Sequence, residues 1–117
     1  MVAMANLDCG LSDLIIERIR AVFIHFAWIN KVILYGSRAK GTYRAGSDID
    51  LTICSDAENM SDYDLLKALS KVLTELDDLN LPYTFDVSIH NQLTNVDLID
   101  HIERVGKVFY ARADLSD

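Results

Sequence analysis

The chain has 117 residues, half of them hydrophobic and a quarter charged, a composition typical of soluble globular proteins, and we expect a single domain over residues 1–117. Its formal net charge of −7 argues against a surface that neutralises a nucleic acid backbone, so we expect no direct nucleic acid contact. The N-terminus lacks the basic flank and apolar core of a signal peptide, and no apolar stretch approaches the roughly 20 residues that span a bilayer. We therefore expect a cytoplasmic protein without membrane contact, in which Cys9 and Cys54 are reduced thiols.

Hydrophobic periodicity divides the chain into alternating helices and strands. Ser12, Ser61 and Asn95 stand where helix N-caps are expected. The predicted helices cover 13–30, 62–79 and 95–106, and the predicted strands cover 31–35, 48–54, 83–89 and 107–111. The buried stripe expected for the second helix consists of Leu65, Leu66, Leu69, Val72, Leu73 and Leu76. The glycine-containing segment between the first two strands suits a wide hairpin loop, and the last strand is expected at a sheet edge. This order predicts an α/β (α+β) fold, a mixed sheet of about four strands flanked by helices.

Two aspartates open the second predicted strand. Side chains alternate between faces along a strand, so Asp48 and Asp50 point the same way while Ile49 and Leu51 point into the core. Like charges held this close repel, and a fold keeps both ionised only when something positive lies between them. Mg²⁺ fits this need, since it commonly takes one or two carboxylates plus substrate phosphates. Asp86 lies in the polar row of the third predicted strand, so three carboxylates converge if that strand neighbours the second.

The segment before these aspartates gathers glycine, serine and positive charge. Gly36 and Ser37 follow directly on a strand, where glycine lets backbone N–H groups approach a phosphate and the serine hydroxyl adds a donor. Basic side chains in the same segment can balance the charge of a triphosphate. We predict nucleotide-binding roles for Gly36, Ser37, Arg38, Lys40 and Ser47. Metals that bridge phosphate oxygens indicate phosphoryl or nucleotidyl transfer, where catalysis is mostly positioning and charge stabilisation.

Gly36-Ser37, ten further residues and then Asp48-Ile49-Asp50 form a pattern that resembles the signature of the DNA polymerase β-like nucleotidyltransferase superfamily. The segment 34–51 is especially similar to the minimal nucleotidyltransferases, or MNT domains, of prokaryotes. The resemblance covers nearly the whole chain. The pattern is not a P-loop, because no Gly-Lys-Ser/Thr follows the glycines.

The resemblance implies catalytic and metal-binding roles for three acids. Asp48 and Asp50 would bind two Mg²⁺ ions that hold ATP, while Asp86 would complete the shell of the second metal and help to deprotonate the attacking hydroxyl. Gly36 and Ser37 would hold the triphosphate. The implied reaction transfers AMP from ATP to a hydroxyl acceptor and releases pyrophosphate.

The resemblance also implies a partner. Small members of this superfamily lack the helical acceptor-binding domain of their larger relatives, and we expect none here. The implied partner is a HEPN-domain toxin, with which this chain would form a hetero-oligomer as the antitoxin that adenylylates a tyrosine. Two alternatives stay open, namely an antitoxin that acts by steric binding without catalysis and a transferase subunit for a small acceptor such as an aminoglycoside. His90 and His101 are interpreted as surface or helix-face residues.

Overall fold

A computed structural model describes residues 7–55 and 60–112 of the chain. Its elements are α1 (Asp13–Ile24), β1 (Lys31–Tyr35), α2 (Gly36–Lys40), β2 (Ile49–Cys54), α3 (Asp62–Asp77), β3 (Phe85–Ile89), the 3-10 helix η1 (His90–Gln92), α4 (Val96–Val105) and β4 (Lys107–Ala111). Within these residues, four strands form one mixed sheet flanked by helices, which confirms the predicted fold class. The ends of the predicted domain 1–117 lie outside the described residues.

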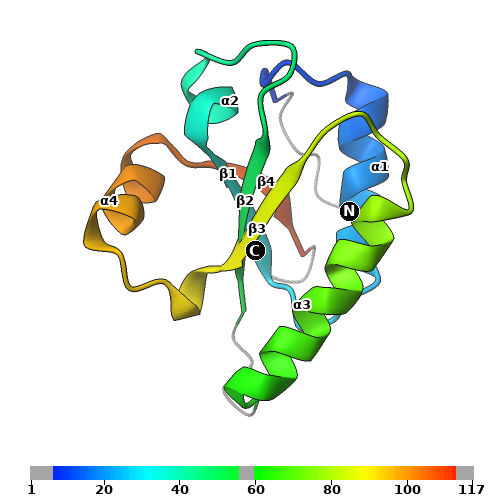
Figure 1. The fold of residues 1–117 in the computed structure, drawn as a ribbon, viewed down its shortest axis with the longest axis vertical. Helices are drawn as coiled ribbons and strands as arrows, with labels where there is room; N and C mark the ends of the chain where they lie inside the picture. The colour runs from blue at the N-terminus through cyan, green and yellow to red at the C-terminus, as the bar shows by residue number, and fades with distance from the viewer. Residues whose placement is uncertain (1–6, 56–59, 113–117) are drawn as a thin grey trace.

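The sheet has the strand order β3-β2-β1-β4, so β4 lies at an edge as predicted and β3 forms the other edge. β1 pairs antiparallel with β2 and β4, whereas β2 and β3 run parallel. Parallel neighbours need a long crossover, and α3 provides it. As a result, the end of β1 and the starts of β2 and β3 meet at the end of the sheet nearest α2 (Figure 1).

The helices form a layer on each face of the sheet, with α1 and α3 packed together on one side and α2 and α4 on the other (Figure 1). Ser12, Ser61 and Asn95 each accept a hydrogen bond from the backbone N–H three residues ahead, so all three predicted caps are confirmed. The main core includes Ile16, Ile19, Val22, Phe23, Val32, Leu34, Leu51, Ile53, Val72 and Leu76. This core lies between the sheet and the helices α1 and α3. Polar side chains of the strands can therefore lie on the opposite face of the sheet.

The structure corrects three expectations about these elements. The connection from β1 to β2 is not a plain loop, because it starts with α2 and turns at Gly41, whose φ is +82°. Helix α1 ends six residues early, since the chain must turn to bury Ile29 before it enters β1. Leu66 and Leu73 of α3 are 61% and 39% exposed and do not belong to the buried stripe.

Two further properties concern the helices and the cysteines of the described residues. None of their helices combines the length and the apolar character that a membrane-crossing helix requires. Cys9 and Cys54 are free thiols, and burial raises the pKa of each above its ordinary value.

Candidate functional site

Strand register brings the predicted acidic residues to one end of the sheet. The parallel pairing of β2 with β3 sets Asp50 beside Asp86, and the antiparallel pairing of β1 with β2 sets Tyr35 on the other side of Asp50. Paired residues point their side chains to the same face, so these three form a row across the sheet. Asp48 lies two residues ahead of Asp50, just before β2 begins, and its side chain is exposed. The row lies on the face opposite the main core.

Gly36 follows the last residue of β1 and therefore lies next to Asp50. Its φ is +72°, and a Cβ added there would meet the Asp50 Oδ2 at 2.1 Å. The left-handed φ and the close approach both favour glycine, which has no side chain. The turn at Gly36 and Ser37 is thus built against the carboxylate of Asp50.

We predict that Gly36→Ala costs more stability than Gly41→Ala. Both glycines have a left-handed φ, and an alanine there loses about 1–2 kcal/mol through backbone strain alone. A Cβ at Gly41 would meet no atom within 4 Å, whereas a Cβ at Gly36 would displace the Asp50 carboxylate. The further cost of that displacement is about 1 kcal/mol or more. Denaturant unfolding of the two variants measures the difference, and equal losses would contradict the close packing at Gly36.

The acidic row carries uncompensated negative charge. Burial raises the pKa of the Asp50 carboxyl above its usual value, and repulsion from Asp86 and then Asp48 adds to the shift. None of the three acids takes part in an ion pair among the described residues. Adjacent, unpaired carboxylates are the hard oxygen donors that suit Mg²⁺, so the donor set fits that ion.

The structure does not place all three acids around one point. No three His, Cys, Asp or Glu side chains within 7–55 and 60–112 lie in positions to hold a metal among themselves. The expectation that Asp48, Asp50 and Asp86 form a ready-made metal cluster is therefore not confirmed. Two carboxylates completed by substrate phosphates are the arrangement that Mg²⁺ commonly uses, and the pair of Asp50 and Asp86 matches it.

The raised pKa of Asp50 predicts how stability depends on pH. Between the ordinary carboxyl pKa, near 4, and the raised value, the folded protein binds more protons at Asp50 than the unfolded chain does. The free energy of unfolding therefore falls as pH rises through this range, and the loss is complete above the raised pKa. We expect Asp50→Asn to raise the melting temperature at pH 7 in EDTA and to have a smaller effect at pH 4. A variant that melts lower at pH 7 would contradict the repulsion.

A chain of hydroxyl groups lies beside the acidic row, and sequence reasoning missed it. The Ser88 hydroxyl donates to Thr52 Oγ1 over 2.9 Å, and the Ser88 side chain also hydrogen-bonds Tyr35. Burial raises the pKa of the Tyr35 phenol, and Asp86 and Asp50 act in the same direction. The hydroxyl groups of Thr52 and Ser88 lie beside the acidic row because of strand register. Thr52 pairs with Ser88, two residues along the strands from the pair of Asp50 with Asp86.

Arg38, for which the sequence predicts a nucleotide-binding role, lies inside the fold in this structure. Its side chain is only 1% exposed, and its guanidinium donates to the carbonyl oxygens of Cys9 and Ser47 at 3.0–3.2 Å. The guanidinium also lies over the rings of Tyr43 and Tyr83. These contacts join the β1–β2 connection to the segment before α1 and to the segment before β3, so Arg38 helps to hold the connection in place.

The other predicted nucleotide-binding residues occupy different positions. Lys40, the last residue of α2, is exposed. The Ser37 carbonyl accepts from the Thr42 N–H at 3.0 Å, which closes the turn after α2. The Ser47 hydroxyl accepts from the Arg44 N–H at 2.8 Å and so shapes the approach to β2.

His101 also lies at the site, although no pattern in the sequence indicates it. It comes from α4, and its Nε2 accepts a hydrogen bond from the Gly36 N–H at 3.2 Å. The ring also packs edge-on against Tyr35, with ring centres 6.1 Å apart. The Gly36 N–H therefore already has a hydrogen-bond acceptor within the protein. In this structure it is not available for the predicted hydrogen bond to a phosphate. Only the folding of α4 onto the sheet could have revealed this neighbour.

The fold and the acidic site together define a nucleotidyltransferase domain. Residues 17–115 match the family described as Polymerase beta, Nucleotidyltransferase, and the chain belongs to that family. No curated protein matches the sequence.

Solved structures with the same fold include toxin–antitoxin complexes. A toxin–antitoxin structure with AMP-PNP aligns with a TM-score of 0.59 at 19% identity, over 85% of this chain and 75% of that one. The toxin–antitoxin MntA-HepT gives 0.54 at 16% identity, over 88% and 75%. A protein from Sulfolobus solfataricus, described provisionally as a nucleotidyltransferase, gives 0.51 at 21% identity, over 85% and 78%. At these identities the likeness shows a shared fold.

Proposed function

We propose that this protein is a Mg²⁺-dependent nucleotidyltransferase that transfers AMP from ATP to a tyrosine hydroxyl of a HEPN-type toxin and thereby acts as its antitoxin. The observation that carries the proposal is the pairing of Asp50 with Asp86 directly beside the Gly36–Ser37 turn. Membership of the polymerase β nucleotidyltransferase family supports the reaction class. The related toxin–antitoxin structure that contains AMP-PNP supports ATP as the donor and a toxin as the partner.

The acidic residues, Ser37 and Lys40 would each have a distinct role in this reaction. Asp50 and Asp86 would hold Mg²⁺ together with phosphate oxygens of the substrate, and Asp48, exposed just ahead of β2, would add a third carboxylate once the ion is bound. The bound ion would neutralise charge on the carboxylates and on the phosphate oxygens. Ser37 would donate a hydrogen bond to the triphosphate, and Lys40 would add positive charge from the exposed end of α2. Asp86 is exposed on the edge strand β3, so an acceptor hydroxyl can approach it, and its carboxylate would take the proton.

The proposal is tested by incubating the protein with Mg²⁺, ATP labelled on the α-phosphate and the HEPN-type protein encoded by a neighbouring gene. We expect label on a tyrosine of that partner with the wild-type chain and none with Asp48→Ala. Asp78→Asn, an exposed change at the end of α3, is the matched control and is expected to transfer label normally.

Two results would contradict the proposal in different ways. A partner that is inhibited but never labelled would show antitoxin action by binding alone. Label transferred to an aminoglycoside but not to the protein partner would show a small-molecule transferase.

A further inference from the structure

One side chain of α4 is tied to the turn that precedes the acidic row. The Gly36 N–H donates to His101 Nε2 over 3.2 Å, although the two residues lie 65 positions apart in the chain. Because Nε2 accepts this bond, the bond assigns the ring proton of the neutral imidazole to Nδ1. The edge-on contact with Tyr35, at an interplanar angle of 81°, fixes the orientation of the ring.

The Gly36 amide needs this partner. Gly36 opens α2, and the first N–H groups of a helix have no acceptor within the helix. The residue is also half-buried, where an amide without a partner destabilises the fold. His101 is thus the acceptor that lets the left-handed turn exist beside Asp50.

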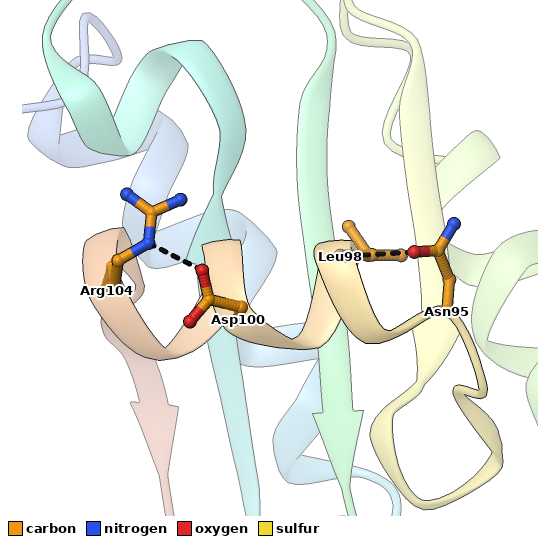
Figure 2. A network of polar contacts seen from close by, with 4 residues as sticks. All are labelled: Asn95, Leu98, Asp100 and Arg104. Carbon is orange, nitrogen blue, oxygen red and sulfur yellow. Dashed lines mark hydrogen bonds and ion pairs between the residues drawn. The ribbon is translucent and has the colours of Figure 1, made fainter.

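Helix α4 is a firm support for the imidazole. Asn95 caps its start by accepting from the Leu98 N–H at 3.1 Å, and Asp100 pairs with Arg104 one turn later at 2.8 Å (Figure 2). Ile102, next to His101, is 3% exposed and anchors the helix against the sheet. The residue that contacts the Gly36–Ser37 turn therefore belongs to a helix packed on the sheet and not to a neighbouring loop.

We propose that His101 is a positioning residue that fixes the Gly36–Ser37 turn against the acidic row, so that the affinity for Mg²⁺ and a nucleotide depends on its hydrogen bond to Gly36. The inference rests on the proposed function. It also assigns the contact of the turn with phosphate to Ser37, because the Gly36 amide is committed to the imidazole.

Two variants separate the hydrogen bond from the bulk of the side chain. His101→Gln can place its amide oxygen near the position of Nε2 and keep an acceptor, whereas His101→Leu fills similar space without one. Binding of Mg²⁺ with a non-hydrolysable ATP analogue is measured by calorimetry, with the exposed α4 change Glu103→Gln as control. We expect His101→Leu to bind about tenfold more weakly, the effect of one lost hydrogen bond, and His101→Gln to stay within about threefold of wild type.

Nuclear magnetic resonance detects the hydrogen bond between the Gly36 N–H and His101 Nε2 without any ligand. We expect a scalar coupling between the Gly36 amide nitrogen and His101 Nε2 in the wild type, and faster hydrogen exchange of the Gly36 amide in His101→Leu than in His101→Gln. Wild-type affinity or tighter binding in His101→Leu, or equal losses in both variants, would overturn the inference. Absence of the coupling would show that the hydrogen bond between Gly36 and His101 does not form. A wild-type protein that shows the coupling but binds no nucleotide would instead overturn the proposed function. The dependence of nucleotide affinity on the hydrogen bond between Gly36 and His101 would then fall with it.

Discussion

Asp50→Asn is expected to reduce the transfer of AMP by on the order of 10³-fold while the protein stays folded. The substitution keeps the shape of the side chain but removes a charged oxygen donor from the pair with Asp86, and metal-based charge stabilisation contributes several kcal/mol to such reactions. The fold is kept because Asp50 takes part in no ion pair among the described residues and its ionised form is disfavoured by burial. Initial rates of label transfer, with circular dichroism of the same samples, measure both effects.

The control for this experiment is a carboxylate away from the site. Asp78→Asn removes one negative charge at the C-terminal end of α3, on the other side of the sheet from Asp50, and is expected to transfer label at the wild-type rate. A variant with Asn at position 50 that retains activity would show that the paired carboxylates do not hold the metal. A variant that unfolds would show that Asp50 has a structural role.

Arg38→Met is expected to lower the free energy of unfolding by about 3–5 kcal/mol even when no ligand is present. The change leaves the buried Cys9 carbonyl oxygen and the half-buried Ser47 carbonyl oxygen without their donor, and an acceptor that is buried without a partner costs about 1–3 kcal/mol. It also removes the stacking of the guanidinium on Tyr43 and Tyr83. Urea unfolding of the nucleotide-free protein measures the loss.

Arg44→Ala is the matched control, because Arg44 is a basic residue of the same connection with an exposed side chain. We expect its stability to stay within about 0.5 kcal/mol of wild type, as is usual for surface changes. Equal stability of the Arg38 and Arg44 variants, combined with weaker nucleotide binding in the former, would restore the ligand-binding role that the sequence suggested for Arg38.

Local signals in the sequence predicted most of the elements. Caps at Ser12, Ser61 and Asn95 and the alternation around Asp86 depend on neighbours within a few residues, so they can be read directly. The spacing from Gly36-Ser37 to Asp50 likewise reflects one antiparallel strand pair, whose geometry links the two segments.

The features that the sequence did not reveal depend on contacts between distant segments. Arg38 looks like a solvent-exposed basic residue until Cys9 and Tyr83 close over it, and no local pattern encodes that burial. His101 looks like any residue of an amphipathic helix until α4 docks beside Gly36. The exposure of Leu66 similarly depends on which side of α3 meets α1 and the sheet.

The five matched pairs between β2 and β3 limit how this protein can change in length. Neighbouring residues in a strand face opposite ways, so inserting one residue into β3 ahead of Asp86 would turn its carboxylate towards α3 and away from Asp50. Residues 80–82, ahead of Tyr83 and of the Thr84 carbonyl that accepts from the Ile49 N–H, lie outside the paired strands and are able to absorb insertions. Homologues and engineered variants should therefore differ in size in that segment and keep the strand itself free of gaps.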